Sequence, residues 1–457
     1  MRGTIDVFNP ARNERIGEVG EFTEEDVAST VERLGAGFPG WSARRPASRG
    51  MVLYRAAEMM RADADRLASI LTAEQGKPLA EARNEILGAA AVFEFYASIA
   101  GTVGGSTVPK ADYGYAFTSR IPLGVCGAII PWNMPALIMA WKTGPAVVTG
   151  NTIVVKPAET TPFTNIEMAR TLYAAGLPED VLAVVTGRGE TTGAAVAGNR
   201  DIRHLSFTGS VETGRKVSGM VDSGRVRLTL ELGGSDPMIV CDDADLERAV
   251  AGAVAGRFYN CGQICTAVKR LFVAEGVADA FTERLKAATE RLRMGDGAAE
   301  GTDLGPLNSI EGLHRIESMV EDSAGSARIV TGARRPEGPG NFYAPTLITD
   351  LEPDSDLLTE EVFGPVLPIV RFGDLDEAID MANSTRFGLG ASIWTRDMRN
   401  AAKAIDGVRS GILWVNRHSR IPPEVPFGGE KGSGIGRENG PGSLDGYLTE
   451  RTVIISP

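Results

Sequence analysis

Apolar residues in the first hundred positions recur at intervals of three and four, the spacing of one face of an α-helix. The stretch RGMVLYRAAEMMRADADRLASILTAE, residues 49–74, shows this spacing most clearly. A GKP break follows at 76–78, and a second long helix is expected to reach about Ala100. The pattern therefore predicts a helical region up to about residue 103.

Beyond residue 123 the pattern changes, because short apolar runs alternate with helical stretches. This alternation is typical of parallel sheets that carry helices on both faces. Two such series are present, with a junction near 233–236, so the chain is predicted to form two α/β lobes. The strands expected in the first series are 125–130, 152–157, 181–186, 202–207 and 227–232, and those in the second are 237–241, 268–273, 365–370, 391–394 and 411–416.

Two other segments alternate apolar and polar residues in the manner of exposed strands. They are YGYAFTSRIP at 113–122 and the C-terminal strand at 448–456, within YLTERTVIIS. A terminal strand with nothing after it usually pairs with another strand, and a neighbouring subunit could supply that partner.

Length and composition narrow the class of protein. A chain of 457 residues with 43% hydrophobic and 23% charged residues fits a globular protein of two or three domains. The net charge of −12 and the lack of a basic block exclude nucleic acid and anionic membrane surfaces as expected partners. The four cysteines indicate free thiols in a reducing cytoplasm. The three histidines share no metal-ligand spacing with them, so no metal is expected and base catalysis falls to a carboxylate or a lysine.

One apolar segment, residues 121–141, is long enough to cross a bilayer. Its prolines and glycines instead divide it into a short strand, a turn and a helix. Asn133 is its single polar side chain. The N-terminal MRGTIDVFNP has no apolar core typical of a secretion signal, so a cytoplasmic protein is predicted.

Cys265 lies in the segment FYNCGQICTAVKRLFV, residues 258–273. The preceding residues predict a helix, NCG is a typical helix end, and Cys265 falls in the turn before the next strand. Functional side chains often lie at such ends of elements. A buried structural thiol is the alternative, and the pair Cys261 and Cys265 alone is weak support for metal or redox chemistry.

Three other segments carry candidate chemistry. Glu231 ends an apolar strand at the junction of the lobes, where a general base is well placed, although a solvated acid is equally compatible with the pattern. SFTGSVETGRKV predicts a strand, a turn and a helix whose N-terminus can receive a pyrophosphate, but it is not the G-x-G-x-x-G spacing. Lys156 and Glu159 follow a buried strand, in a position that suits a ribose or a phosphate.

Taken in order, these segments resemble the aldehyde dehydrogenase superfamily, from NPA at 9–11 to the terminal strand. The matching segments are PWNMP, GNTIVVKPAE, FTGS, LELGG, GQIC, EEVFGP, NSTRFGLGASIW, WVN and PFGGEKGSGIGRE. The resemblance implies a two-lobed α/β fold with a Rossmann-like NAD-binding domain, an α/β catalytic domain and a small β extension for oligomerisation. It assigns them respectively to 1–103 with 123–233, to 234–432, and to 104–122 with 440–457, in a homodimer or homotetramer.

The resemblance also implies a role for each matching catalytic residue. Cys265 would attack the aldehyde, and the Asn133 amide with the Cys265 backbone N–H would hold the resulting oxyanion. Hydride would leave to NAD, and Glu231 would activate the water that hydrolyses the thioester. Glu438 would be a second acid that supports proton transfer.

The implied cofactor is NAD, with NADP possible. Glu159 favours NAD because a carboxylate accepts hydrogen bonds from the ribose 2′-hydroxyl and repels a 2′-phosphate. The implied cofactor-binding residues are Pro131, Trp132, Lys156, Glu159, Phe207, Gly209, Ser210, Leu232, Glu361 and Phe363.

The implied substrate tunnel is mostly apolar, which favours a medium aliphatic or aromatic aldehyde. Its lining would be Ile138, Trp141, Ile264, Thr266, Ile421 and Phe427. Arg417 or Arg420 could instead bind the carboxylate of a semialdehyde. Transfer of the acyl group to coenzyme A, reduction of an acyl group, and a non-catalytic binding role are further alternatives, and Glu231 argues against the first two. Cys261 has no implied function, but a disulfide that protects Cys265 from oxidation is a minority hypothesis.

Overall fold

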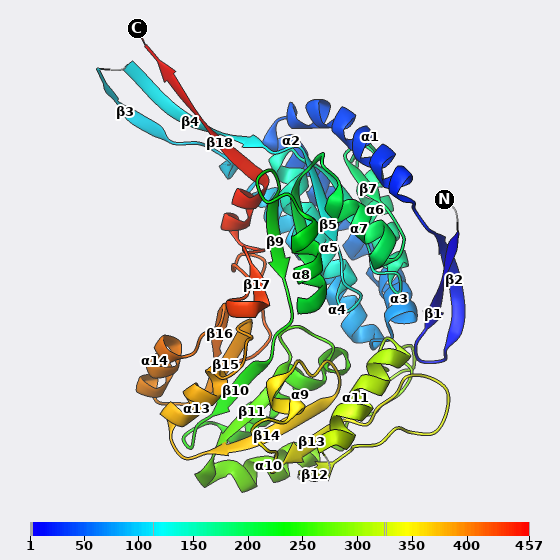
Figure 1. Ribbon diagram of the computed structural model, residues 1–457, viewed down its shortest axis with the longest axis vertical. Coiled ribbons are helices and arrows are strands. Elements are labelled where there is room, and N and C mark those ends of the chain that lie inside the picture. Colours follow the sequence, from blue (N-terminus) through cyan, green and yellow to red (C-terminus); the bar gives the residue numbers. More distant parts are fainter. Residues whose placement is uncertain (1–2, 113, 324, 326, 457) are drawn as a thin grey trace.

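Two twisted sheets, each flanked by helices, are stacked along the long axis of the molecule, and a thin β arm projects from one end (Figure 1). The computed structural model describes residues 3–112, 114–323, 325 and 327–456. Tyr113, the first residue of the strand predicted at 113–122, lies outside the described residues. The α/β fold class is confirmed.

The chain begins with a β-hairpin, so the prediction of helix from the N-terminus is wrong for residues 4–20. Strands β1 (Thr4–Asn9) and β2 (Glu14–Gly20) pair antiparallel, with a bulge between Val7 and Phe8. Ile5 and Val7 are buried while their neighbours are exposed, which is the two-residue period of a strand. The helical prediction holds from α1 onward. These helices are α1 (Glu24–Ser42), α2 (Pro46–Ala62), α3 (Ala64–Gln75), α4 (Leu79–Ser98) and the short η1 (Ala100–Thr102).

The sheet of the first lobe contains the five strands predicted for it. Within the described residues its order is β17-β9-β8-β5-β6-β7, and all neighbours are parallel except β17 and β9. The two-residue β17 comes from the C-terminal region and was not predicted. The strands are β5 (Val125–Ile129), β6 (Thr152–Lys156), β7 (Leu182–Val184), β8 (Ile202–Thr208), β9 (Arg227–Glu231) and β17 (Gly434–Ile435).

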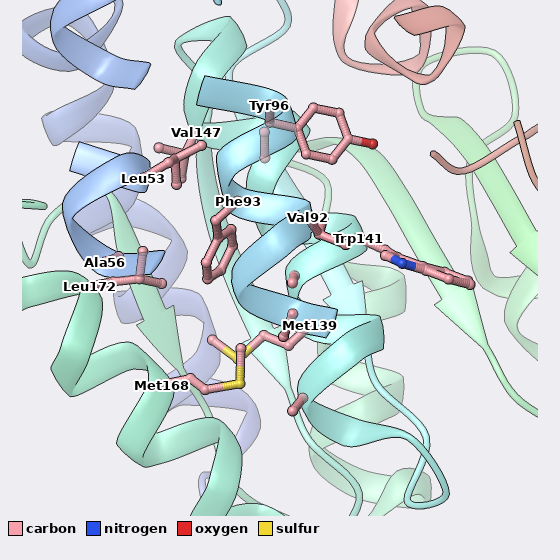
Figure 2. Packing of buried hydrophobic residues seen from close by; sticks show 14 of the residues in the cluster. Leu53, Ala56, Val92, Phe93, Tyr96, Met139, Trp141, Val147, Met168 and Leu172 are labelled. Carbon is pink, nitrogen blue, oxygen red and sulfur yellow. The ribbon is translucent and has the colours of Figure 1, made fainter. Parts of the chain in front are cut away.

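Helices pack this lobe into a core in which α4 and α5 lie side by side (Figure 2). Phe93 and Tyr96 from α4 meet Met139 from α5 in one buried cluster. The apolar segment 121–141 divides between β5 and α5, as predicted. Among the described residues, no helix is both long and apolar enough to span a membrane. The remaining helices of this lobe are α5 (Pro135–Thr149), α6 (Pro162–Ala174), η2 (Gly189–Gly193), α7 (Ala194–Gly198) and α8 (Val211–Met220).

The second lobe has a sheet ordered β12-β13-β14-β11-β10-β15-β16 over the described part of the chain, with antiparallel pairing at β12 only. Five of these strands were predicted. The short β12 and β13 were missed because they hold only four residues each, and β13 also follows an irregular stretch from 332 to 345. The strands are β10 (Asp236–Val240), β11 (Val268–Ala274), β12 (Arg328–Thr331), β13 (Thr346–Thr349), β14 (Val366–Phe372), β15 (Gly390–Trp394) and β16 (Ile412–Val415).

Helices cover both faces of this second sheet. The turn that carries Cys265 lies between helix α9 and strand β11. Helix α9 ends at Phe258, and the 3-10 turn η3 connects it to β11. The helices are α9 (Leu246–Phe258), η3 (Tyr259–Gly262), α10 (Glu275–Thr289), α11 (Ile310–Ser323), α12 (Asp356–Thr359), α13 (Leu375–Asn383) and α14 (Met398–Gly407), and the later 3-10 turns are η4 (Lys431–Ser433) and η5 (Pro441–Tyr447).

The arm consists of β3 (Thr107–Ala111), β4 (Gly114–Pro122) and β18 (Leu448–Ile455). The terminal strand β18 pairs antiparallel with β4 of the same chain, from Leu448 opposite Pro122 to Ile455 opposite Tyr115. The partner of the predicted terminal strand is therefore intramolecular. β18 forms an outer edge of the arm, and the predicted assembly into a dimer or tetramer stays a prediction.

Candidate active site

A cavity of about 610 Å³ lies where β9 of the first sheet passes into β10 of the second. Cys265, Glu231 and Asn133 all border it, although they come from different lobes or different elements. Glu231 is the last residue of β9, Asn133 lies between β5 and α5, and Cys265 follows η3. The fold therefore brings the three predicted catalytic side chains to one cavity.

The turn before Cys265 has an unusual backbone. Asn260 and Cys261 adopt left-handed conformations, with φ of 50° and 56°, so the chain reverses sharply after α9. Cys265 is partly exposed to the cavity, and its carbonyl oxygen accepts a hydrogen bond from Lys269 Nζ at 2.5 Å. Burial raises the pKa of the Cys265 thiol to about 12, and the Lys269 charge opposes that rise. The thiol is therefore protonated at neutral pH in this state.

Asn133 is fixed through both its side chain and its backbone. Its Nδ2 donates to the Gln263 carbonyl oxygen at 2.9 Å, which ties it to the loop that carries Cys265. Its own carbonyl oxygen accepts from Asn260 Nδ2 at 3.0 Å. Because the side-chain amide carries two N–H groups, one remains for a ligand in the cavity.

A buried ion pair contacts the turn that carries Asn133. Lys77 Nζ lies 2.5 Å from Glu85 Oε2 and 2.7 Å from the Asn133 carbonyl oxygen. Glu85 Oε1 accepts from the backbone N–H groups of Ala136 and Leu137, at the start of α5. Both charged side chains are completely buried. This pair therefore provides hydrogen-bond partners for the first N–H groups of α5 and fixes the position of Asn133.

Glu231 is buried without a hydrogen-bond partner for either carboxylate oxygen among the described residues. Burial raises its pKa well above the ordinary value, and the nearby charge of Glu438 raises it further. Lys142 and Arg437 act in the opposite direction. A carboxylate with a raised pKa suits proton abstraction near neutral pH.

Glu438 lies behind Glu231 and outside the cavity lining. It accepts a hydrogen bond from Ser206 Oγ at 2.7 Å and contacts Lys142 Nζ in a buried ion pair. Phe427 pairs with Glu438 through an isolated antiparallel bridge within the C-terminal segment. The second predicted acid thus interacts with Glu231 by charge rather than by a direct hydrogen bond.

The cavity continues along the predicted cofactor residues. Ser210 caps the N-terminus of α8, where its Oγ accepts from the Thr213 N–H at 3.1 Å. A Cβ on Gly209 would lie 2.5 Å from the Phe207 ring, so only glycine allows this close approach. The predicted cofactor residues that border the cavity are Pro131, Trp132, Gly209, Ser210, Leu232, Glu361 and Phe363, whereas Lys156, Glu159 and Phe207 lie outside its lining.

Lys156 and Glu159 form an ion pair of their own at the end of β6. Lys156 Nζ lies 3.1 Å from Glu159 Oε2, and the lysine is buried while the glutamate side chain is 43% exposed. The buried ammonium group can donate hydrogen bonds to ribose hydroxyls, and the accessible carboxylate can accept hydrogen bonds from them. These residues therefore fit the predicted ribose site.

Glu361 and Phe363 close the cavity on the side of the second lobe. Glu361 Oε1 accepts from the Gly234 N–H at 3.1 Å and lies 3.2 Å from Lys269 Nζ. Phe363 packs edge to face against Trp132, with ring centroids 5.5 Å apart. Lys269 therefore connects Glu361 with the carbonyl oxygen of the Cys265 turn.

The predicted substrate residues divide into a lining and a support. Ile138, Trp141, Ile264, Thr266 and Ile421 border the cavity, but Phe427 does not. Phe427 is buried behind Trp141, with ring centroids 5.2 Å apart.

The two arginines considered for a substrate carboxylate do not lie in the tunnel. Arg417 and Arg420 are exposed, and neither borders the cavity in the described part of the chain. The tunnel wall near them is formed by His418, Ser419 and Ile421.

Comparison with known proteins identifies the family. The profile described as "Aldehyde dehydrogenase family" matches residues 1–453. The chain belongs to this family.

Individual relatives agree with this assignment. The chain is 39% identical over 467 residues to a phenylacetaldehyde dehydrogenase from Pseudomonas fluorescens, covering 99% of this chain and 93% of that protein. It is 38% identical over 459 residues to a glutarate-semialdehyde dehydrogenase from Pseudomonas putida, covering 99% and 94%. The crystal structure of a betaine aldehyde dehydrogenase from Staphylococcus aureus in complex with NAD+ superimposes with a TM-score of 0.96 at 32% identity, covering 100% and 92%.

The resemblance seen in the sequence is thus confirmed, and the chain is an NAD(P)-dependent aldehyde-oxidising enzyme.

Several residues around this aldehyde dehydrogenase site were missed by sequence reasoning. Lys142 had a detectable signal, because it is the single charged side chain of the apolar helix α5. The other missed residues, which resemble ordinary surface residues in sequence, are Lys77, Glu85, Lys269, His418 and Arg315, the last of which borders the cavity.

His418 supports the wall beside the nucleophile. Its Nε2 donates to the Thr266 carbonyl oxygen at 2.8 Å, which requires the neutral ring to accept at Nδ1 from the Ser392 hydroxyl at 2.8 Å. Burial lowers the pKa of His418 to about 4, so the ring stays neutral. This histidine holds the loop that carries Ile421 against the Cys265 turn.

Proposed function

We propose that this enzyme oxidises medium aliphatic or aromatic aldehydes to carboxylic acids with NAD, through a thioester on Cys265. The observation that carries the proposal is the meeting of Cys265, Asn133 and Glu231 in one largely apolar cavity. An apolar tunnel with few polar groups suits an uncharged substrate tail.

In the first step Cys265 Sγ attacks the aldehyde carbon. The oxyanion that forms is held by the free N–H of the Asn133 amide and by the backbone N–H of Cys265. Because burial raises the pKa of the thiol, Cys265 must pass its proton to a base before it attacks. Glu231, which borders the same cavity, is the carboxylate that would take this proton, and the charge of Lys269 favours the loss.

Bound NAD+ would supply the acceptor for the hydride that leaves the tetrahedral adduct. Lys156 and Glu159 would hold its adenosine ribose, Ser210 at the start of α8 would receive the pyrophosphate, and Glu361 would hold the nicotinamide ribose. The accessible carboxylate of Glu159 supports a preference for NAD, because it would repel a 2′-phosphate.

Hydrolysis of the thioester is assigned to Glu231. Its carboxylate has a raised pKa, so it can take a proton from water near neutral pH. Glu438 lies behind it as the second acid, paired with Lys142. A general base at this position disfavours transfer of the acyl group to coenzyme A.

A semialdehyde is the second candidate substrate, because a relative at 38% identity is a glutarate-semialdehyde dehydrogenase. The exposed positions of Arg417 and Arg420 favour an uncharged tail instead.

Assembly through the arm is also proposed. Tyr115 and Ile454 on this arm are each 60% exposed, and β18 has an edge available to another strand. The expected assembly is a homodimer or homotetramer. Light scattering after size-exclusion chromatography of Ile454→Lys should show a smaller species than the wild type.

The function is tested by NAD+ reduction with aliphatic, aromatic and semialdehyde substrates, with and without coenzyme A. We expect NADH without coenzyme A, no turnover for Cys265→Ala, and a single NADH burst followed by arrest for Glu231→Gln. NADH that forms only with coenzyme A would overturn the hydrolytic mechanism. A clear preference for semialdehydes would replace the proposed substrate class.

A further inference from the structure

Three arginines of the described chain are buried and have main-chain carbonyl oxygens as their hydrogen-bond partners. Arg49, Arg257 and Arg270 are each 5% exposed or less. Each of them donates to three carbonyl oxygens rather than to a carboxylate. Because a buried charge without a counter-charge is costly, each of these positions requires a reason.

Two of the three arginines connect elements that lie away from the cavity. Arg49 joins α5 to the end of α1 and the segment after it. Arg270 joins the residue before β10 to the end of α13. None of the carbonyl groups that they bind belongs to a residue that borders the cavity. Both arginines therefore have a structural role.

Arg257 instead contacts the segment that carries the nucleophile. It is the penultimate residue of α9, the helix that leads into the turn of Cys265 (Figure 1). Its Nη1 donates to the carbonyl oxygen of Val268 at 3.1 Å, at the start of β11. Within the turn, a Cβ on Gly262 would lie 3.1 Å from Arg257 Nη2 and 2.4 Å from the Gly364 carbonyl oxygen. The guanidinium is thus in close contact with the chain before and after Cys265.

The same guanidinium holds the loop on the other side of the cavity. Its Nη2 donates to the carbonyl oxygens of Val362, at 3.0 Å, and of Gly364. These two residues are the neighbours of Phe363, which borders the cavity together with Glu361. One planar group of Arg257 therefore joins the nucleophile segment to the loop of the predicted cofactor residues.

This double contact depends on the shape of the guanidinium group. Its N–H groups point in fixed directions in one plane, so two nitrogens can bind different segments at the same time. A lysine ammonium is a point charge on a flexible chain and cannot fix the separation of two segments in this way.

We propose that Arg257 is a positioning residue for hydride transfer, because its guanidinium sets the separation between the Cys265 turn and the loop of Glu361 and Phe363. The inference rests on the proposed function, in which Glu361 holds the nicotinamide ribose. A change at Arg257 shifts the nicotinamide half of the cofactor site and leaves the adenosine half, which lies on the first lobe, in place.

The first test measures binding to Arg257→Lys, with Arg49→Lys as the matched control. Calorimetry without aldehyde compares NAD+ with ADP, which lacks the nicotinamide half. Arg257→Lys should weaken NAD+ binding about tenfold, the effect of about one lost hydrogen bond, and leave ADP binding unchanged. Arg49→Lys should change neither affinity, although both variants should lower the Tm because buried carbonyl groups lose their donors.

Kinetics with hexanal provide the second readout. Arg257→Lys should lower kcat by about 10- to 100-fold, since a displacement of about 1 Å has effects of this order. The primary isotope effect with hexanal deuterated at the aldehyde carbon should rise, because hydride transfer becomes slower relative to the other steps. Alkylation of Cys265 by iodoacetamide without cofactor should keep its wild-type rate, which separates this role from activation of the thiol.

Equal losses of NAD+ and ADP binding, or wild-type affinities with an unchanged isotope effect, would overturn the proposal and assign Arg257 to packing. If Arg257→Lys does not fold, Gly262→Ala displaces the same two segments with the guanidinium intact, and a wild-type ratio of NAD+ to ADP affinity in it would overturn the proposal. Failure of both variants to fold would do the same. Because binding is measured without aldehyde, a wild type that binds NAD+ but oxidises no aldehyde would overturn the proposed function alone.

Discussion

Lys77 Nζ donates to the carbonyl oxygen of Asn133 at 2.7 Å, from a position without solvent exposure. The residue that is proposed to hold the oxyanion is therefore positioned by a lysine 56 residues earlier in the chain. Its partner Glu85 binds the first N–H groups of α5, so one buried ion pair fixes both sides of the Asn133 turn.

Replacement of Lys77 by methionine should reduce kcat by about 100-fold, because a misplacement of about 1 Å in a catalytic group has effects of this order. It should also lower the Tm, since loss of one partner leaves Glu85 buried without its counter-charge, at a cost of about 3–5 kcal/mol. Steady-state kinetics and calorimetry measure the two effects.

Arg83→Met is the matched control, because Arg83 lies on α4, the helix that carries Glu85, and pairs with Asp65 at 2.7 Å on the surface. An exposed pair contributes about 0–1 kcal/mol, so little change is expected. If Lys77→Met lowers the Tm but leaves kcat at the wild-type value, the lysine does not position Asn133.

Glu231→Gln should stabilise the protein while it stops hydrolysis. The folded-state pKa of Glu231 is raised, so the folded state retains a proton that the unfolded chain loses above its ordinary pKa. Stability is therefore lost as pH rises from the unfolded pKa toward the folded one, and glutamine removes this loss. The Tm difference between variant and wild type should grow as the pH rises above the unfolded pKa of a glutamate, about 4.3.

Glu438→Gln provides the contrast, because Glu438 is paired with the buried Lys142. Its loss leaves that ammonium group without its counter-charge and should lower the Tm. A Tm for Glu231→Gln below that of the wild type at every pH above the unfolded pKa of glutamate would show that the buried carboxylate stabilises the fold.

Sequence reasoning succeeded where the signal is local. The strand before Glu231 is a short apolar run, and the position of the acid at its end follows from the run itself. The same local reasoning failed for residues 4–20, because a long helical pattern after them was extended too far. Lys77 and Glu85 had no local signal at all, since their burial arises from the packing of α4 on α5. Residues that act on the site through tertiary packing are thus the ones that sequence alone does not reveal.

Replacement of Lys269 by glutamine should move the reactivity of Cys265 to higher pH. The Lys269 charge lowers the thiol pKa, whereas Asp236, Glu361 and Glu231 raise it. The rate of Cys265 alkylation by iodoacetamide, followed as a function of pH, measures the shift. Glu361→Gln removes one of the opposing charges and should move the profile to lower pH, so equal profiles for both variants would contradict this electrostatic account.

Mild peroxide should oxidise Cys265 without linking it to Cys261. Cys261 is buried in the core of the second lobe, whereas Cys265 packs beside the core of the first lobe and faces the cavity. Burial also raises the pKa of the Cys261 thiol, which makes it a poor nucleophile toward an oxidised partner. Mass spectrometry of peptides after peroxide treatment should show sulfinic or sulfonic acid at Cys265 and a free thiol at Cys261. Cys261→Ser should be inactivated by peroxide at the wild-type rate, and slower recovery of activity on reduction in this variant would instead support a protective disulfide.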